Sequence, residues 1–139
     1  MRRWMLLALC GGILWLCLPR DAIACRCAGA LSPRAAYQRA PVVVRAEVRS
    51  VTGDINKAGV TATLRVSQAW KKRVSREVTV FTNTTCAFVF RPGTEYLLYL
   101  YETPAEGYYT ARCLGNLLIT AANRSLAWLD RYGALAAVE

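Results

Sequence analysis

Histidine is absent from all 139 residues of this sequence, and acidic residues number only 9 against 18 basic ones. Without histidine, a serine or cysteine nucleophile lacks its usual general base. Zinc ligation is disfavoured too, because the chain has neither histidine nor a Cys-x-x-Cys pair. The carboxylates are scattered, and no glycine-rich phosphate loop follows a strand. These absences predict a protein that is not an enzyme and uses no cofactor.

A hydrophobic run long enough to cross a membrane is also missing. The apolar stretch at 4–18 has 15 residues, short of the roughly 20 that a membrane-spanning helix needs. Two arginines precede it, and Ala22-Ile23-Ala24 follows. This order is typical of a signal peptide cleaved before Cys25. We therefore expect residues 1–24 to be removed and the protein to be secreted, extracellular or periplasmic, and not transmembrane.

Four of the six cysteines lie in residues 25–139, a length suited to one domain. In a small exported domain, Cys25, Cys27, Cys86 and Cys113 predict a disulfide framework. A bond between Cys25 and Cys27 would be strained, because a single residue separates them. Each is therefore expected to reach a different distant cysteine, and geometry leaves both pairings open.

Hydrophobic periodicity predicts a mainly β fold. Ser32 followed by proline predicts a helix over 33–39, and Gly133 ends a second helix over 123–132. Alternating or apolar runs predict strands at 42–51, 60–70, 77–82, 87–90, 96–101 and 108–114. Their spacing favours a five-stranded Greek-key barrel of the oligonucleotide/oligosaccharide-binding (OB) type, with a short N-terminal helix and a C-terminal helix.

The net charge is +9, and the first 24 residues contribute only two of these charges. The one dense basic cluster is Lys71, Lys72 and Arg73 with Arg76. It lacks the interleaved aromatic residues of a base-stacking surface, which argues against nucleic acid. We expect at most weak, salt-sensitive attraction to an anionic glycan or lipid surface. Trp70 and the strand tyrosines are expected mainly in the core.

Several motifs follow one another in a fixed order along residues 25–139. They are Cys25-Arg26-Cys27, Ala35-Ala36-Tyr37 before the strand at 42–48, Val66–Lys72, the isolated Cys86, Gly93–Tyr99, Tyr109–Cys113, and Ser125-Leu126 with Arg131-Tyr132. In order and spacing they resemble the amino-terminal domain of the tissue inhibitors of metalloproteinases, within the netrin-like superfamily. The resemblance covers almost all of residues 25–139.

The resemblance implies a five-stranded barrel with flanking helices and the disulfides Cys25–Cys86 and Cys27–Cys113. It also implies that the α-amine and carbonyl oxygen of Cys25 chelate the catalytic zinc of a target protease, so the isolated chain binds no metal itself. The side chain of Arg26 would enter the pocket beside that zinc, where the family has a small Thr or Ser. A long cation does not suit an apolar pocket, so either the target differs or inhibition has been lost.

The family also carries a third bridge, from its first helix to the chain beyond its last helix. Tyr37 stands where the helix cysteine would fall, and no cysteine follows Cys113. Both partners of that bridge are therefore missing together.

Three functional hypotheses follow. The first is an exported inhibitor of a zinc metalloprotease, acting through Cys25 and Arg26. The second is a netrin-like module that binds a protein or a glycan without inhibiting a protease. The third treats the segment before Cys25 as a lipoprotein cleavage site, in which case acylation of the Cys25 amine would abolish chelation.

Overall fold

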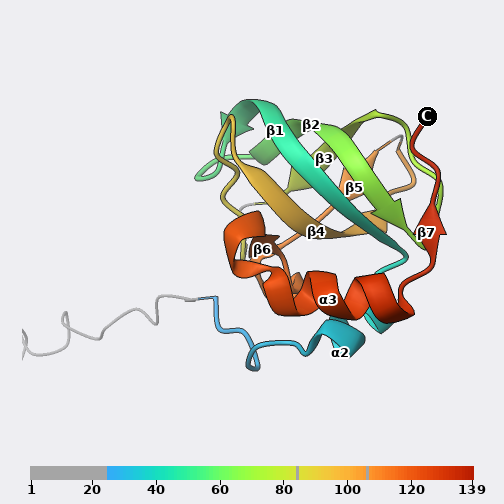
Figure 1. Cartoon of the computed structure of the whole chain (residues 1–139). Coiled ribbons are helices and arrows are strands. Elements are labelled where there is room, and N and C mark those ends of the chain that lie inside the picture. The colour runs from blue at the N-terminus through green and yellow to red at the C-terminus, as the bar shows by residue number, and fades with distance from the viewer. Residues whose placement is uncertain (1–24, 84, 106) are drawn as a thin grey trace, which may run out of the picture.

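The computed structural model describes residues 25–139 except residues 84 and 106 (Figure 1). The expected signal peptide, residues 1–24, lies outside this part. The first described helix, α2 (Pro33–Arg39), begins where the sequence predicts it. The Ser32 hydroxyl accepts a hydrogen bond from the Ala35 N–H at 3.2 Å, and Pro33 occupies the first turn, where its missing N–H costs nothing.

Five strands close into a barrel. They are β1 (Val42–Asp54), β2 (Gly59–Trp70), β3 (Glu77–Thr82), β4 (Glu95–Glu102) and β5 (Tyr108–Tyr109). β1 pairs with β2, β2 with β3, β3 with β5, β5 with β4, and β4 with β1 again. The β3–β5 pairing is parallel and the others are antiparallel. The five-stranded OB-type barrel predicted from the sequence is thus confirmed.

β1 is long because it serves two neighbours. Its first half pairs with β4 over Val42–Glu47, and its whole length pairs with β2. The register against β2 shifts between Arg45 and Ala46 and again between Val48 and Ser50. Such bulges bend and twist a strand, which lets β1 curve around the barrel.

The core has two parts, one on each face of the sheet. Alternate side chains such as Val44, Leu64 and Leu98 fill the barrel interior. A second cluster lies outside the barrel, where helices α2 and α3 (Asn123–Tyr132) cover one side of it (Figure 1). Trp70 and Leu129 are fully buried there. Burial on both faces explains why β4 reads as an unbroken apolar run.

The strand expected at 87–90 does not form. These residues belong to no strand; Phe88 and Phe90 instead pack edge-to-face on each other and on Tyr96. The Phe88 N–H donates to the Thr82 hydroxyl at 3.0 Å. This side-chain contact takes the place of a strand–strand hydrogen bond.

The strand expected at 108–114 ends at Tyr109. Beyond it, the Asn116 side chain takes a strand's place beside β4, accepting from the Tyr99 N–H at 2.8 Å and donating to the Thr110 hydroxyl and the Ala111 carbonyl. Between Ala111 and Asn116 the chain forms a short 3₁₀ helix, Arg112–Leu114. A local side-chain hydrogen bond competes here with the sheet.

Three short elements were not predicted from the sequence: strands β6 (Leu117–Leu118) and β7 (Leu135–Ala136), and a 3₁₀ helix at Ile119–Ala121. β6 pairs with β4, and β7 pairs with the end of β2. In the part of the chain that the structure describes, no helix combines the length and the apolar character needed to cross a membrane.

Candidate functional site

Two disulfides hold residues 25–27 against the barrel. Cys25 is bonded to Cys86, with 5.1 Å between their Cα atoms, and Cys27 to Cys113, with 5.2 Å. This is the pairing that the family resemblance implies. The bonded partners lie 61 and 86 residues apart in sequence, so each bridge ties this segment to a distant loop. Cross-links over loops of this length restrict the unfolded chain strongly.

The two receiving loops are joined to each other. The Arg112 N–H donates to the Cys86 carbonyl at 2.8 Å, next to the Cys113 bridge. The sulfurs of Cys25 and Cys113, from different disulfides, lie 3.7 Å apart. The segments around Cys86 and Cys113, to which residues 25–27 are bonded, therefore contact each other. This contact limits the movement of one segment relative to the other.

Sulfur atoms of Cys25, Cys86 and Cys113 lie within 4.8 Å of one another, a spacing that a metal ion would accept. All three are committed to disulfides, however. Metals bind the thiolate, which a disulfide sulfur does not provide. This cluster is accordingly a structural anchor.

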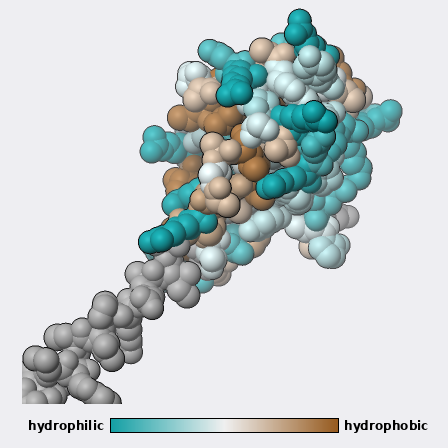
Figure 2. Space-filling view, turned by 90° about the horizontal axis from the view of Figure 1, so that it is seen from below, coloured by the Kyte–Doolittle hydropathy of each residue, from teal (hydrophilic) through white to brown (hydrophobic). Residues whose placement is uncertain are grey.

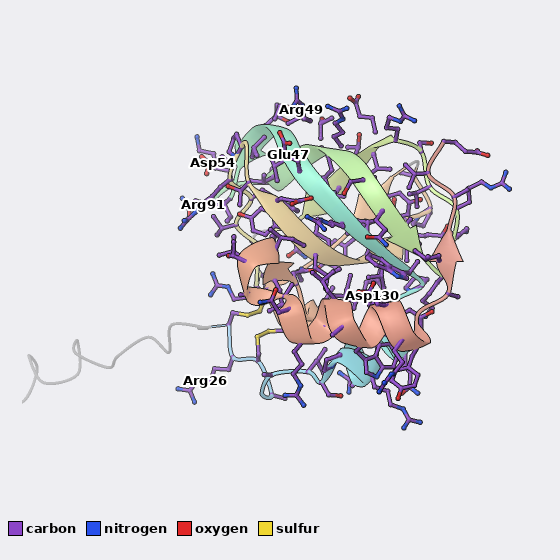
Figure 3. The ribbon with its side chains drawn as sticks, in the orientation of Figure 1. Arg26, Glu47, Arg49, Asp54, Arg91 and Asp130 are labelled. Carbon is purple, nitrogen blue, oxygen red and sulfur yellow. A yellow bond between two sulfur atoms is a disulfide. The ribbon has the colours of Figure 1, made fainter. Side chains whose placement is uncertain are left out.

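Arg26 lies between the two bridged cysteines and is exposed. Figure 3 shows its side chain directed away from the barrel, close to the two disulfides. One groove of about 400 Å³ beside Cys25 is formed by residues of three loops: Ile55, Asn56, Thr85, Cys86, Ala87 and Arg112. Residues 25–27 and these groove residues together form what we term the disulfide-bound ridge.

Arg112 also lines a second, more apolar groove. Its walls include Phe88, Leu117 and two exposed aliphatic side chains, Val89 at 51% and Leu118 at 44% exposure. The sequence analysis did not identify Asn56, Val89, Arg112 or Leu118 as functional residues. The one available signal was the position of Arg112 next to a bridged cysteine.

The basic cluster at 71–76 has partners inside the molecule. The Lys71 ammonium donates to the carbonyls of Tyr37 and Ala40. Lys72 forms an ion pair with Glu102, and that hydrogen bond raises the pKa of Lys72. Lys71 and Lys72 thus both bind groups within this same molecule.

Arg73 is engaged too, since its guanidinium lies 2.7 Å from a Glu139 carboxylate oxygen. Arg76 is exposed and borders a groove on the barrel side. Weak, salt-sensitive binding of an anionic surface by this cluster stays a prediction, with three of its four cations already engaged.

The aromatic residues divide between core and surface. Trp70, Tyr96 and Tyr99 are buried, as expected for the core, and burial raises the pKa of Tyr99. Tyr101, Tyr108 and Tyr109 are half-buried.

Tyr37 links helix α2 to the chain beyond α3 without a covalent bond. Its hydroxyl accepts a hydrogen bond from the Ala134 N–H at 3.0 Å, across 97 residues of sequence. Ala134 lies two residues beyond Tyr132, the last residue of helix α3. A hydrogen bond therefore joins α2 to the chain beyond α3.

No family model matches this chain, and no curated protein matches it significantly.

Proposed function

We propose that this protein is an exported, non-enzymatic inhibitor of a zinc metalloprotease, acting through the disulfide-bound ridge. The observation that carries the proposal is the attachment of Cys25 and Cys27 to two joined loops, with exposed Arg26 between them. A segment held in this way loses little conformational entropy on binding. The family resemblance supplies the chemistry, namely coordination of zinc by a terminal amine and its carbonyl oxygen.

The proposal requires cleavage before Cys25, which creates that amine. An α-amine has a pKa of about 8, so its neutral, coordinating form is accessible near neutral pH. Coordination would occupy the position where a metalloprotease holds its catalytic water.

The test compares two forms of the oxidised protein against a panel of zinc endopeptidases. One form begins at Cys25 and the other carries one additional alanine before it. We expect the extension to weaken inhibition about a thousandfold. Loss of zinc coordination by the amine should cost roughly 4 kcal/mol of binding free energy, which corresponds to three orders of magnitude in affinity. Thermal unfolding of both forms is the control, because the extension leaves both disulfides in place.

Arg26→Thr provides the second arm. Removing a cation that an apolar pocket would have to desolvate should strengthen inhibition of enzymes with apolar pockets. Intact mass determines in advance whether the Cys25 amine is free or acylated. If the form with a free amine inhibits no panel member, and Arg26→Thr does not restore inhibition, the inhibitor proposal is wrong and an interaction module is favoured.

A further inference from the structure

A groove of about 480 Å³ runs between helices α2 and α3, on the molecular face away from the barrel strands. Figure 2 views the molecule from below, the side on which α2 and α3 lie in Figure 1. The residues that line this interhelical groove are Arg34, Tyr37, Gln38, Trp128 and Tyr132.

Three aromatic rings follow one another along the groove. The Trp128 ring centroid is 5.2 Å from that of Tyr37 and 5.4 Å from that of Tyr132. Tyr132 is 61% exposed, although α3 has a separate core side centred on buried Leu129. Packing against the barrel therefore does not account for the exposed ring. Aromatic rings with polar edges are typical of surfaces that bind a ligand.

The groove carries positive charge. Arg34 lines it, and the Arg131 guanidinium lies 5.9 Å from the Tyr132 ring centroid. Within the described residues, neither arginine lies within ion-pair distance of a carboxylate. The nearest acidic residue on α3, Asp130, is two positions from Trp128, or about 200° around the helix. A ligand with negative charge would thus complement the groove.

We propose that the interhelical groove binds a carboxylated polysaccharide. The apolar face of a sugar ring would lie on Trp128 and Tyr132, and the Arg34 guanidinium would pair with a carboxylate, which its planar fork matches. Gln38 adds an amide for sugar hydroxyls. The row of aromatic rings beside a guanidinium suits a chain of sugar rings that carry carboxylates. This proposal does not depend on cleavage before Cys25 or on inhibition.

Tryptophan fluorescence of the oxidised form that begins at Cys25 tests the proposal, with oligogalacturonate as the probe and a cello-oligosaccharide of equal length as its neutral counterpart. Residues 25–139 contain two tryptophans, and Trp70 is fully buried, so a change reports on Trp128. We expect a saturable change with oligogalacturonate and a much weaker one with the neutral oligosaccharide.

Variants locate the site. Arg34→Gln should weaken binding about tenfold, the loss expected for one charge-assisted contact. Tyr132→Ala should weaken it as well, whereas Tyr132→Phe keeps the ring and should retain binding. Arg65→Gln removes the same charge from an exposed position on β2 and serves as the matched control. Thermal unfolding checks that each variant is folded.

Three results would overturn the proposal. The first is no fluorescence change with oligogalacturonate. The second is an equal loss for Arg65→Gln and Arg34→Gln, which would indicate attraction to overall charge. The third is preference for phosphatidylglycerol vesicles over oligogalacturonate, with Tyr132→Ala abolishing vesicle binding, which would make this face a membrane-binding surface.

Discussion

At the scale of single residues, one ion pair joins the two strands that close the barrel. The Arg45 guanidinium on β1 donates to both Glu95 carboxylate oxygens on β4, at 2.8 and 3.0 Å. The hydrogen bond from Arg45 is the main reason that the pKa of Glu95 is lowered, and burial opposes it. A carboxylate with a lowered pKa stabilises the folded state above its unfolded pKa of about 4.3.

We expect Glu95→Gln to lower the free energy of unfolding at pH 7 by about 0.5–1 kcal/mol. The effect is small because 38% of the Arg45 side chain and 30% of the Glu95 side chain are exposed. The difference should shrink as the pH falls below about 4. Urea unfolding at pH 7 and pH 3 measures it, with Glu47→Gln as a control at a more exposed pair. The same difference at both pH values would contradict this assignment.

At the scale of elements, the end of α3 is set by a close approach between Gly133 and the barrel. A Cβ placed on Gly133 would lie 2.6 Å from the Leu129 carbonyl oxygen and 2.8 Å from a carbon of the buried Trp70 ring. Gly133→Ala should therefore push the end of α3 away from β2 and destabilise the fold by about 1–3 kcal/mol, the usual cost of overpacking. Thermal or urea unfolding measures this, and near-ultraviolet circular dichroism reports on the Trp70 environment. An unchanged unfolding midpoint would show that the helix end shifts without cost.

At the scale of the whole molecule, the two disulfides connect the segment before α2 to loops on both sides of β4. Replacing Cys27 and Cys113 together by serine removes one bridge without leaving an unpartnered thiol. We expect a loss of about 2–5 kcal/mol in the free energy of unfolding. Unfolding under non-reducing conditions measures it, and peptide mapping checks that Cys25–Cys86 remains. A loss well below this range would mean that the Cys25–Cys86 bridge and packing hold residues 25–27 without the second bridge.

Local sequence patterns predicted most of the barrel. The alternation in 60–66 places Val60, Ala62, Leu64 and Val66 inside, and all four are buried. The predicted bounds of α2 and α3 match the structure. The predicted strand at 108–114 is too long, because periodicity does not reveal that the Asn116 side chain, and not a strand, accepts the hydrogen bond from the Tyr99 N–H. The ridge was predicted in part. The cysteine spacing indicated that Cys25 and Cys27 each bond to a distant cysteine, but Asn56 and Arg112 come from segments that only the fold brings together.

The sequence by itself determined the strand and helix pattern and the need for two long-range disulfides, because these follow from spacing and from the strain of a short cysteine loop. Tertiary structure decided the arrangement of charge. The dense cluster at 71–73 is engaged by Glu102, Glu139 and main-chain carbonyls. Arg34 and Tyr132, almost a hundred positions apart, line one groove. Charge partners and surface grooves depend on which distant segments the closed barrel brings together. Local periodicity does not show which segments these are.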